Sequence, residues 1–420
     1  MTQYKSLIST QHPSHWEVVR NKAFLSLTGE AVGKRAKDFV LLSLTTNGIV
    51  VRDVESGKGK FPKDFDTYQI VRPNELVFCL FDIDETPRTV GLVEKEGMLT
   101  GAYTALNVNQ KRAFPQFVYY YYLAVDNIKG LKPYYSGLRK TVRADKFLQI
   151  YIPLPPLSEQ EKIVSYLDSK TSKIDSYVAD KEKEILLLQE LKQKTIAEAV
   201  TKGLNPNVKM KDSGISWLGK IPVHWETKRI ASLFTGRVKA NSDFEYHHAF
   251  KFYYGTLVPK EETGDIEEYR DTYVKYSVLQ KDDIMINGLN LNYDFISQRV
   301  AIAPSDGIIT SAYVVARPRK DTNAQYYNYL FKTMDNMKLF HGMGTGIRLT
   351  LSFDELKKQL VIVPPVDEQQ TIVSYIEEKC QKIDILITEL QAEIDYLKEY
   401  KQRLIADVVT GQVNVQNETI

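Results

Sequence analysis

The chain has 420 residues, 43% hydrophobic and 26% charged, which is ordinary for a globular protein and enough for two or three domains. Its net charge of +2 is unevenly divided, because residues 1–152 carry 21 Lys and Arg against 15 Asp and Glu, whereas residues 364–420 carry 5 against 11. The first segment therefore suits a polyanionic partner better than the last.

A short motif near the N-terminus, Pro13-Ser14-His15-Trp16-Glu17, recurs 209 residues later as Pro222-Val223-His224-Trp225-Glu226. We interpret the Trp and His of each copy as anchors of a first strand to its core. Short runs with strand character follow each motif. They lie at residues 39–44, 48–54, 76–80 and 104–108, and again at 249–254, 273–276, 283–286 and 312–316.

An amphipathic helix is predicted next in each copy, over residues 114–127 and 323–336. Both segments are rich in tyrosine, and we expect these rings to lie in the core. A loop with a shared pattern follows, Gly137-Leu138-Arg139 in the first copy and Gly346-Ile347-Arg348 in the second. Glycine permits close backbone approach to a ligand, and arginine can bind phosphate or guanine with two hydrogen bonds.

This repeated loop is the best local candidate for DNA contact, although a plain surface loop remains open as an alternative. A scaffold that is repeated with divergent loops suggests that function lies in the loops, and further side chains complete the candidate set. The candidate DNA-binding residues are Lys34, Arg35, Lys58, Lys60, Tyr134, Tyr135, Gly137, Arg139, Lys140, Arg143, Asn290, Asn292, Tyr293, Gly344, Gly346, Arg348 and Thr350.

Two long helices are predicted, one after each globular segment. The prolines Pro155-Pro156 and Pro364-Pro365 forbid helix upstream, and Ser158 or Asp367 can act as the N-cap of a capping box. A helix from Ser158 to Thr201 would be about 66 Å long at ~1.5 Å per residue. Each of the two long helices has apolar residues at only two heptad positions, and so narrow an apolar stripe is typical of a helix that packs against a partner helix. The stripes are Ile163, Leu167, Ile174, Val178, Ile185 and Leu188, and Ile372, Ile376, Ile383, Ile387, Ile394 and Leu397.

The chain is thus a tandem duplication, and its fold class is predicted as α+β. We expect two mixed, β-rich domains, each followed by a long helix, with the helices paired in a coiled coil of pseudo-two-fold symmetry. The expected boundaries are 1–152 and 217–362 for the domains, 153–203 and 363–411 for the helices, 204–216 for a linker and 412–420 for a tail.

No catalytic centre is predicted. The segment Gly29 to Arg35 has the wrong spacing for a phosphate loop, and the acidic cluster of Asp82, Asp84 and Glu85 lacks a lysine at nuclease spacing. The six histidines and two cysteines show no metal-ligand pattern. The longest apolar or aromatic run, Phe117 to Val125, is too short for a membrane span, and no N-terminal signal is present, so we expect a cytoplasmic protein.

The sequence resembles the specificity subunits of Type I restriction-modification systems. The resemblance rests on Pro153 to Val164 (PLPPLSEQEKIV), its partner Val363 to Val373 (VPPVDEQQTIV), the two His-Trp-Glu motifs and the order domain, helix, domain, helix. It implies two target-recognition domains that read the halves of a bipartite asymmetric DNA target, and an antiparallel coiled coil that sets their spacing.

The resemblance also implies a non-catalytic chain that binds double-stranded DNA and docks methyltransferase subunits, two in number, with restriction/translocase subunits as possible further partners. S-adenosylmethionine, ATP and Mg would then be bound by the partner subunits, and no cofactor by this chain. The alternative is a coiled-coil adaptor whose flanking domains bind proteins; a steep fall of affinity with salt would favour DNA.

Overall fold

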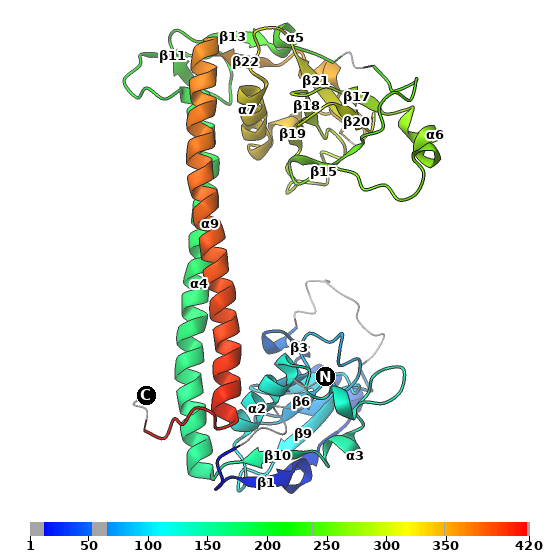
Figure 1. Ribbon diagram of the computed structural model, residues 1–420, viewed down its shortest axis with the longest axis vertical. Helices are drawn as coiled ribbons and strands as arrows, with labels where there is room; N and C mark the ends of the chain where they lie inside the picture. Colours follow the sequence, from blue (N-terminus) through cyan, green and yellow to red (C-terminus); the bar gives the residue numbers. More distant parts are fainter. Residues whose placement is uncertain (1–11, 53–64, 237–238, 348, 418–420) are drawn as a thin grey trace. The chain divides into compact units, whose positions relative to one another are not determined.

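The computed structural model describes residues 12–52, 65–236, 239–347 and 349–417 (Figure 1). The chain forms two compact units, each of which combines a globular domain with parts of both long helices. Unit 1 consists of Met1–Glu182 and Gln391–Ile420, and unit 2 of Lys183–Leu390. Among the described residues, none of the helices is both long and apolar enough to cross a bilayer.

The globular domain of unit 1 is built on antiparallel strands. A four-stranded sheet has the order β2-β9-β6-β7, and three two-stranded ladders pair β1 with β10, β3 with β4 and β5 with β8. The bounds are β1 Glu17–Arg20, β2 Leu25–Leu27, β3 Leu42–Thr45, β4 Gly48–Val51, β5 Gln69–Val71, β6 Leu76–Phe78, β7 Val90–Leu92, β8 Gly97–Leu99, β9 Thr104–Val108 and β10 Tyr151–Leu154.

Helix α2 packs against this sheet beside β7, and buries its tyrosines as expected. Tyr121 and Tyr122 are fully buried, and the Tyr122 hydroxyl accepts a hydrogen bond from Asn21 Nδ2 at 2.5 Å. The helical segments of the domain are η1 Asn21–Ala23, η2 Gly33–Asp38, α2 Pro115–Asn127, η3 Lys132–Tyr134 and α3 Ala144–Phe147.

The domain of unit 2 repeats this topology. Its four-stranded sheet has the order β14-β21-β18-β19, and β13 pairs with β22, β15 with β16 and β17 with β20. The bounds are β13 Glu226–Arg229, β14 Phe234–Thr235, β15 Phe250–Tyr253, β16 Thr256–Pro259, β17 Ser277–Leu279, β18 Ile284–Ile286, β19 Val300–Ile302, β20 Gly307–Ile309, β21 Val314–Pro318 and β22 Leu360–Val363.

Helix α7 is the counterpart of α2, and the chain segment that leads into this domain adds a small ladder of β11 and β12. The remaining bounds are β11 Met210–Asp212, β12 Lys220–Pro222, α5 Ile230–Leu233, η4 Ile266–Tyr269, α6 Arg270–Tyr273, α7 Ala324–Asn336, η5 Leu339–Gly342 and α8 Phe353–Leu356.

One predicted strand is wrong. Residues 273–276 do not form a strand, because Tyr273 ends helix α6 and the strand β17 starts only at Ser277. The rings of Tyr269, Tyr273 and Tyr276 pack on one another at centroid distances of 5.5 and 5.1 Å. Their spacing of four and three residues is the helical one, and it outweighs the strand preference of tyrosine.

The long helices are α4, Leu157–Lys202, and α9, Val366–Val409. The helices begin one residue before the predicted N-caps, so that Ser158 and Asp367 lie in the first turn and are not N-caps. Each helix ends before a glycine in the left-handed conformation, with φ of 74° at Gly203 and 75° at Gly411. Such a glycine is a common C-terminal stop signal, since it avoids the steric penalty of a Cβ atom.

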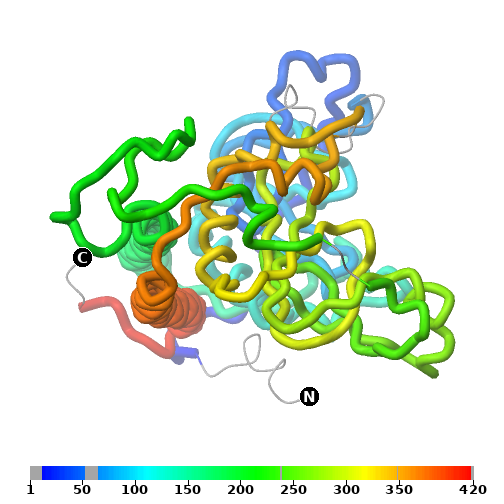
Figure 2. Tube along the Cα trace, turned by 90° about the horizontal axis from the view of Figure 1, so that it is seen from above, coloured from blue at the N-terminus to red at the C-terminus, as the bar shows by residue number. Residues whose placement is uncertain are grey.

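Within each unit, α4 and α9 pair antiparallel; Figure 2 shows the two helices nearly end-on. In unit 1, Asp175 pairs with Lys401 at 2.7 Å and Glu182 pairs with Lys398 at 3.2 Å. The residue numbers on α9 therefore decrease as those on α4 increase, which is antiparallel pairing. In unit 2, Lys192 bonds Asp384 at 2.6 Å. Asp175 and Asp384, like Lys192 and Lys401, stand 209 residues apart, so the same ion pair recurs in both units.

The described stripe residues of both helices are buried or half-buried. Their environment changes along the helix, however. Ile372 and Ile376, at the start of α9, belong to the core of the domain in unit 2, together with Tyr326, Leu330 and Phe331. The first turns of the stripe therefore join the helix to its domain, a role that the heptad pattern alone did not predict.

The His-Trp-Glu motif holds the start of each long helix, which differs from the predicted role of anchoring only a first strand. Trp16 is buried, and its Nε1 donates to Glu159 Oε1 at 3.1 Å, while His15 Nε2 lies 2.8 Å from Glu159 Oε2. The second copy repeats both contacts between Trp225, His224 and Glu368, at 3.0 and 2.7 Å. Each domain and its helix therefore meet through the same polar junction.

Candidate nucleic-acid interface

The predicted Gly-x-Arg loop is a tight hairpin in both domains. In hairpin 1, residues 136–141, the backbones of Ser136 and Thr141 exchange hydrogen bonds of 3.0 and 3.2 Å, and Lys140 N donates to Gly137 O at 3.1 Å. Gly137 and Lys140 have φ angles of 76° and 42°. Both angles lie in the left-handed region, which favours glycine and so explains the glycine at position 137.

Hairpin 2, residues 345–347 and 349–350, repeats these hydrogen bonds and positive φ angles. Thr345 and Thr350 exchange hydrogen bonds of 3.1 and 2.9 Å, and Leu349 N donates to Gly346 O at 3.1 Å. Gly346 and Leu349 have φ angles of 77° and 40°. The duplication therefore preserved a backbone shape at this position as well as three residue types.

A second loop lies against each hairpin. Loop 1, residues 79–89, connects β6 to β7, and its Asp82 N donates to Arg139 O at 2.9 Å. Loop 2, residues 287–299, connects β18 to β19, and its Leu291 N donates to Leu349 O at 3.2 Å. The two domains thus present equivalent pairs of loops, formed by segments about 50 to 60 residues apart in the sequence.

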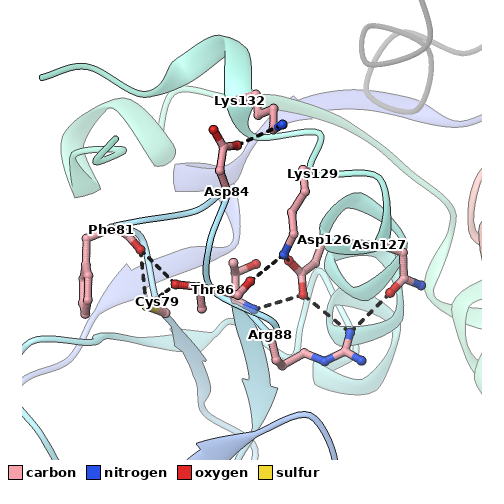
Figure 3. A network of polar contacts seen from close by, with 10 residues as sticks. Cys79, Phe81, Asp84, Thr86, Arg88, Asp126, Asn127, Lys129 and Lys132 are labelled. Atoms are coloured by element: carbon pink, nitrogen blue, oxygen red, sulfur yellow. Dashed lines mark hydrogen bonds and ion pairs between the residues drawn. The ribbon is translucent and has the colours of Figure 1, made fainter. Parts of the chain in front are cut away.

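Loop 1 is held by a polar network (Figure 3). Asp126 on α2 binds Lys129 at 2.9 Å and accepts from the backbone N of Thr89 at 3.0 Å, and Lys129 also donates to Thr86 O at 2.7 Å. Lys132 reaches Asp84 of the loop at 3.1 Å. The loop is therefore tied at its C-terminal end and in its middle to α2 and to the segment between α2 and hairpin 1.

Loop 2 also has an aspartate contact at its C-terminal end, but it is held mainly by a buried arginine. Arg299 is 1% exposed, and its guanidinium donates to the backbone oxygens of Asn287, Leu289 and Asp294 at 3.0, 2.8 and 2.7 Å. Its own backbone N donates to Asp335, the counterpart of Asp126, at 2.6 Å. A buried cation that satisfies several carbonyl oxygens fixes the course of the loop, because leaving any of them unpaired would be costly.

Several predicted DNA-contacting cations in unit 1 already have acidic partners. Lys140 contacts Glu85 at 2.7 Å and Asp84 at 3.0 Å, and these contacts raise the pKa of its ammonium group. Arg35 binds Glu30, whose pKa is lowered by hydrogen bonds from Arg72 and Arg35. Side chains neutralised in this way are less suited to bind phosphate than the sequence alone suggested.

Other predicted residues of unit 1 gather at the base of hairpin 1. Tyr134 and Arg143 line a hollow of about 480 Å³ with Ser136, Lys146 and Gln149. Arg143 also lies 3.2 Å from Asp145, in an exposed pair. Arg139 is exposed, and its guanidinium lies over the Phe81 ring of loop 1 at 6.0 Å. Lys34 and Gly137 are exposed, Tyr135 is half-buried, and Lys58 and Lys60 lie outside the described residues.

The predicted residues of unit 2 are divided between loop 2 and hairpin 2. Asn292 Nδ2 donates to Ile347 O at 3.4 Å and so joins the two loops. Asn290 and Tyr293 are exposed, as is Gly346, whereas Gly344 and Thr350 are half-buried. Arg348 lies outside the described residues.

Sequence reasoning overlooked three features of this surface. It did not single out Arg299, whose burial has no local sequence signal, or the exposed Phe295 and Ile296 of loop 2. It also passed over Leu138 and Ile347 at the hairpin tips, although an apolar residue between Gly and Arg in both copies was visible as a pattern. Among the described residues, no group of three or more His, Cys, Asp or Glu side chains could hold a metal ion.

The chain resembles known proteins over nearly all of its length. A family profile described as "Type I restriction modification DNA specificity domain" matches residues 89–187 and 222–396. The MjaVIII specificity subunit of Methanocaldococcus jannaschii is 24% identical over 440 aligned positions, covering 99% of this chain and 96% of the relative. The EcoKI specificity subunit of Escherichia coli K12 is 22% identical, covering 66% of this chain and 60% of the relative.

Solved structures share the fold. One from a study titled "Structural basis underlying complex assembly and conformational transition of the type I R-M system" aligns with a TM-score of 0.67 at 16% identity, covering 96% of this chain and all of the other. The HsdS subunit of Thermoanaerobacter tengcongensis aligns with a TM-score of 0.53 at 16% identity, covering 96% and 99% of the two chains. The predicted α+β fold of two β-rich domains and two long paired helices is confirmed.

Proposed function

Because the chain belongs to the family of Type I restriction-modification DNA specificity subunits, we propose that each of its domains reads one half of a bipartite, asymmetric DNA target. The observation that carries this proposal is the repeated loop-and-hairpin pair. Its backbone recurs in both domains, yet loop 1 is charged and loop 2 carries amides and aromatic rings. Two unlike half-sites require the same backbone support with different side chains, because side chains at the base edges read the sequence.

The helices α4 and α9 would set the distance between the half-sites and dock two methyltransferase subunits. Support comes from the antiparallel pairing within each unit and from the polar junction that joins every domain to the start of its helix. Restriction/translocase subunits would join this assembly. The chemistry, with S-adenosylmethionine, ATP and Mg, would belong to the partner subunits, and we infer that this chain chooses the site.

Mapping methylated bases tests the proposal directly. The chain is expressed with the methyltransferase subunit of its own system in cells that lack other methylation, and modified positions are read by sequencing. We expect two different short sequences separated by a fixed, unread gap. Methylation that is unchanged when the chain is omitted, or that follows one continuous motif, would contradict the proposal.

Loop substitutions give a sharper second step. Tyr293→Ala in loop 2 should change methylation at one half-site only, and Arg139→Ala in hairpin 1 at the other only. An adaptor that bound only proteins would instead leave the methylated sequence untouched. Its binding would also lack the steep salt dependence that phosphate contacts produce.

A further inference from the structure

The tip of each hairpin carries a large aliphatic side chain that none of the described residues of its own unit covers. Leu138 is 103% exposed and Ile347 is 98% exposed, so both side chains are as accessible to solvent as in an isolated extended peptide. They stand 209 residues apart and occupy the same position of the same turn. Single exposed hydrophobic residues are common on protein surfaces, so exposure by itself would mean little.

Two features distinguish these residues from scattered surface hydrophobics. The apolar tip recurs in both domains although the adjoining loops 1 and 2 differ in sequence and in how they are held. The turn beneath each tip is also tightly closed, by the paired backbone hydrogen bonds between Ser136 and Thr141 or Thr345 and Thr350. A closed turn keeps the side chain extended, where a loose loop would let it fold back onto the surface.

The charge around the tips indicates the partner. Arg139 and Arg348 directly follow the two tips in the sequence, and Arg139 is exposed, with its guanidinium over the Phe81 ring. Lys129, Lys132 and Lys140 are instead bound to Asp126, Asp84 and Glu85, so the arginines are the cations that bear on the choice of partner. An exposed guanidinium beside an apolar tip suits a nucleic acid, because it can bind phosphates and base edges. Leucine and isoleucine are among the side chains that minor-groove proteins insert between base pairs, and arginine favours a narrow minor groove.

We propose that Leu138 and Ile347 are wedges, one for each half-site, that insert between neighbouring base pairs of the bound duplex. This inference rests on the proposed function and extends it. Each tip would partly unstack one base step, so a half-site would be selected by how easily that step opens as well as by contacts to base edges. Pyrimidine–purine steps open most easily, and we expect one at each wedge.

Fluorescence of 2-aminopurine, which rises when the base loses its stacking neighbours, tests the wedge. The complex of the full chain with its methyltransferase subunits is titrated with duplexes that carry the target found by methylation mapping, with 2-aminopurine at successive positions. We expect Leu138→Ser to abolish a rise in the first half-site only and Ile347→Ser in the second only. Each should weaken binding by roughly 10- to 100-fold, as expected for one lost apolar contact.

Two controls make the result specific. Base flipping by the methyltransferase subunits produces its own signal at the modified base, and this signal should persist in both variants. Leu27→Ser, which changes another exposed leucine, 55% exposed on β2, should leave binding and fluorescence unchanged. Leu138→Met, which keeps a long apolar tip, should retain the signal that Leu138→Ser loses.

The outcomes separate the wedge from the proposed function. If the wild-type complex does not distinguish its target from unrelated DNA, the proposed function fails. If it does, but no fluorescence change depends on Leu138 or Ile347, the wedge is refuted and the function stands. A third outcome is that the serine variants bind more weakly, that replacing one thymine of the DNA with uracil weakens wild-type binding equally, and that no base is unstacked. The side chains would then contact a thymine methyl group, and the wedge would be overturned.

Discussion

A fragment of residues 1–210 should assemble into a symmetric dimer. It contains the domain of unit 1 and all of α4, but it lacks residues 391–409 of α9, which pack in unit 1 against α4. The C-terminal part of α4 in a second fragment is the sequence counterpart of the missing segment. Asp175 of one copy would then meet Lys192 of the other, in place of the 2.7 Å contact with Lys401.

The substitute is a good but incomplete match, and the difference can be estimated. Ile196 and Val200 replace Ile405 and Val409 without loss of size. Leu404 and Val408, which are 8% and 0% exposed in unit 1, are replaced by Thr195 and Ala199. This removes four carbon atoms, and adds one hydroxyl, in each of two seams, which at ~0.8 kcal/mol per buried carbon amounts to roughly 6 kcal/mol per dimer.

Restoring the lost carbons therefore provides the test. Thr195→Leu with Ala199→Val in the fragment should tighten the dimer by about four orders of magnitude, since 1.4 kcal/mol is tenfold, and sedimentation equilibrium measures the change. In the full chain the same pair of substitutions should destabilise, by about 1–3 kcal/mol, because Ala199 is buried in the filled core of unit 2. The opposite signs cannot arise from a general effect on helix α4.

Two results would refute this reasoning. One is a folded, stable monomer of the fragment at micromolar concentration, and the other is a dimer whose affinity is unchanged by the double substitution. With methyltransferase subunits, the dimer should modify an inverted repeat of the first half-site, because identical domains related by a two-fold axis read a palindrome. Methylation at the asymmetric parent site would count against the architecture.

Three further predictions concern the hairpins, the helices and the domain–helix junction. Arg139→Ala and Arg348→Ala should each weaken DNA binding by about 1–3 kcal/mol. If the arginine contacts a base, the loss should appear at one half-site only; if it contacts phosphate, the loss should be the same for all sequences. A competition assay with DNA mutated in one half-site distinguishes the two cases. Inserting four residues after Lys181 moves the following part of the helix by about 6 Å, which is close to the length of two base-pair steps. Methylation mapping should then show a longer gap between two unchanged half-sites. An unchanged gap would contradict the spacer role. Glu159→Ala leaves the buried indole N–H of Trp16 without its acceptor. The substitution should therefore lower the free energy of unfolding by about 1–3 kcal/mol, which denaturant titration measures. An equal loss on substituting an exposed glutamate elsewhere would contradict this explanation.

The paired long helices, the buried tyrosine helices and the internal duplication were predictable from the sequence. Each of them depends on regular spacing or on direct repetition, and such patterns are local. The heptad stripe from Ile163 to Leu188 predicts a helix with a partner wherever the partner lies. The misassigned strand at residues 273–276 shows the limit of this reasoning, because its two tyrosines suit a strand by type, whereas together with Tyr269 they suit a helix by spacing.

The electrostatic state of the candidate interface was decided only by tertiary contacts. Lys140 looked available for phosphate, yet Glu85 and Asp84, some 55 residues earlier in the chain, neutralise it in the folded domain. Arg299 gave no sign of its role, because its partners are backbone oxygens, which every residue type supplies. Such contacts join distant segments, and spacing along the chain carries no information about them.

The division of the molecule into units shows the same contrast. Repetition established that there are two equivalent halves, but the folded units do not coincide with those halves, since each domain packs with the start of its own helix and the end of the other. That exchange follows from antiparallel pairing, which brings the end of α4 to Trp225 and the end of α9 to Trp16. The sequence by itself determined which surfaces must be covered, and only the tertiary structure decided what covers them, because apolar burial is non-directional and any matching stripe could have satisfied it.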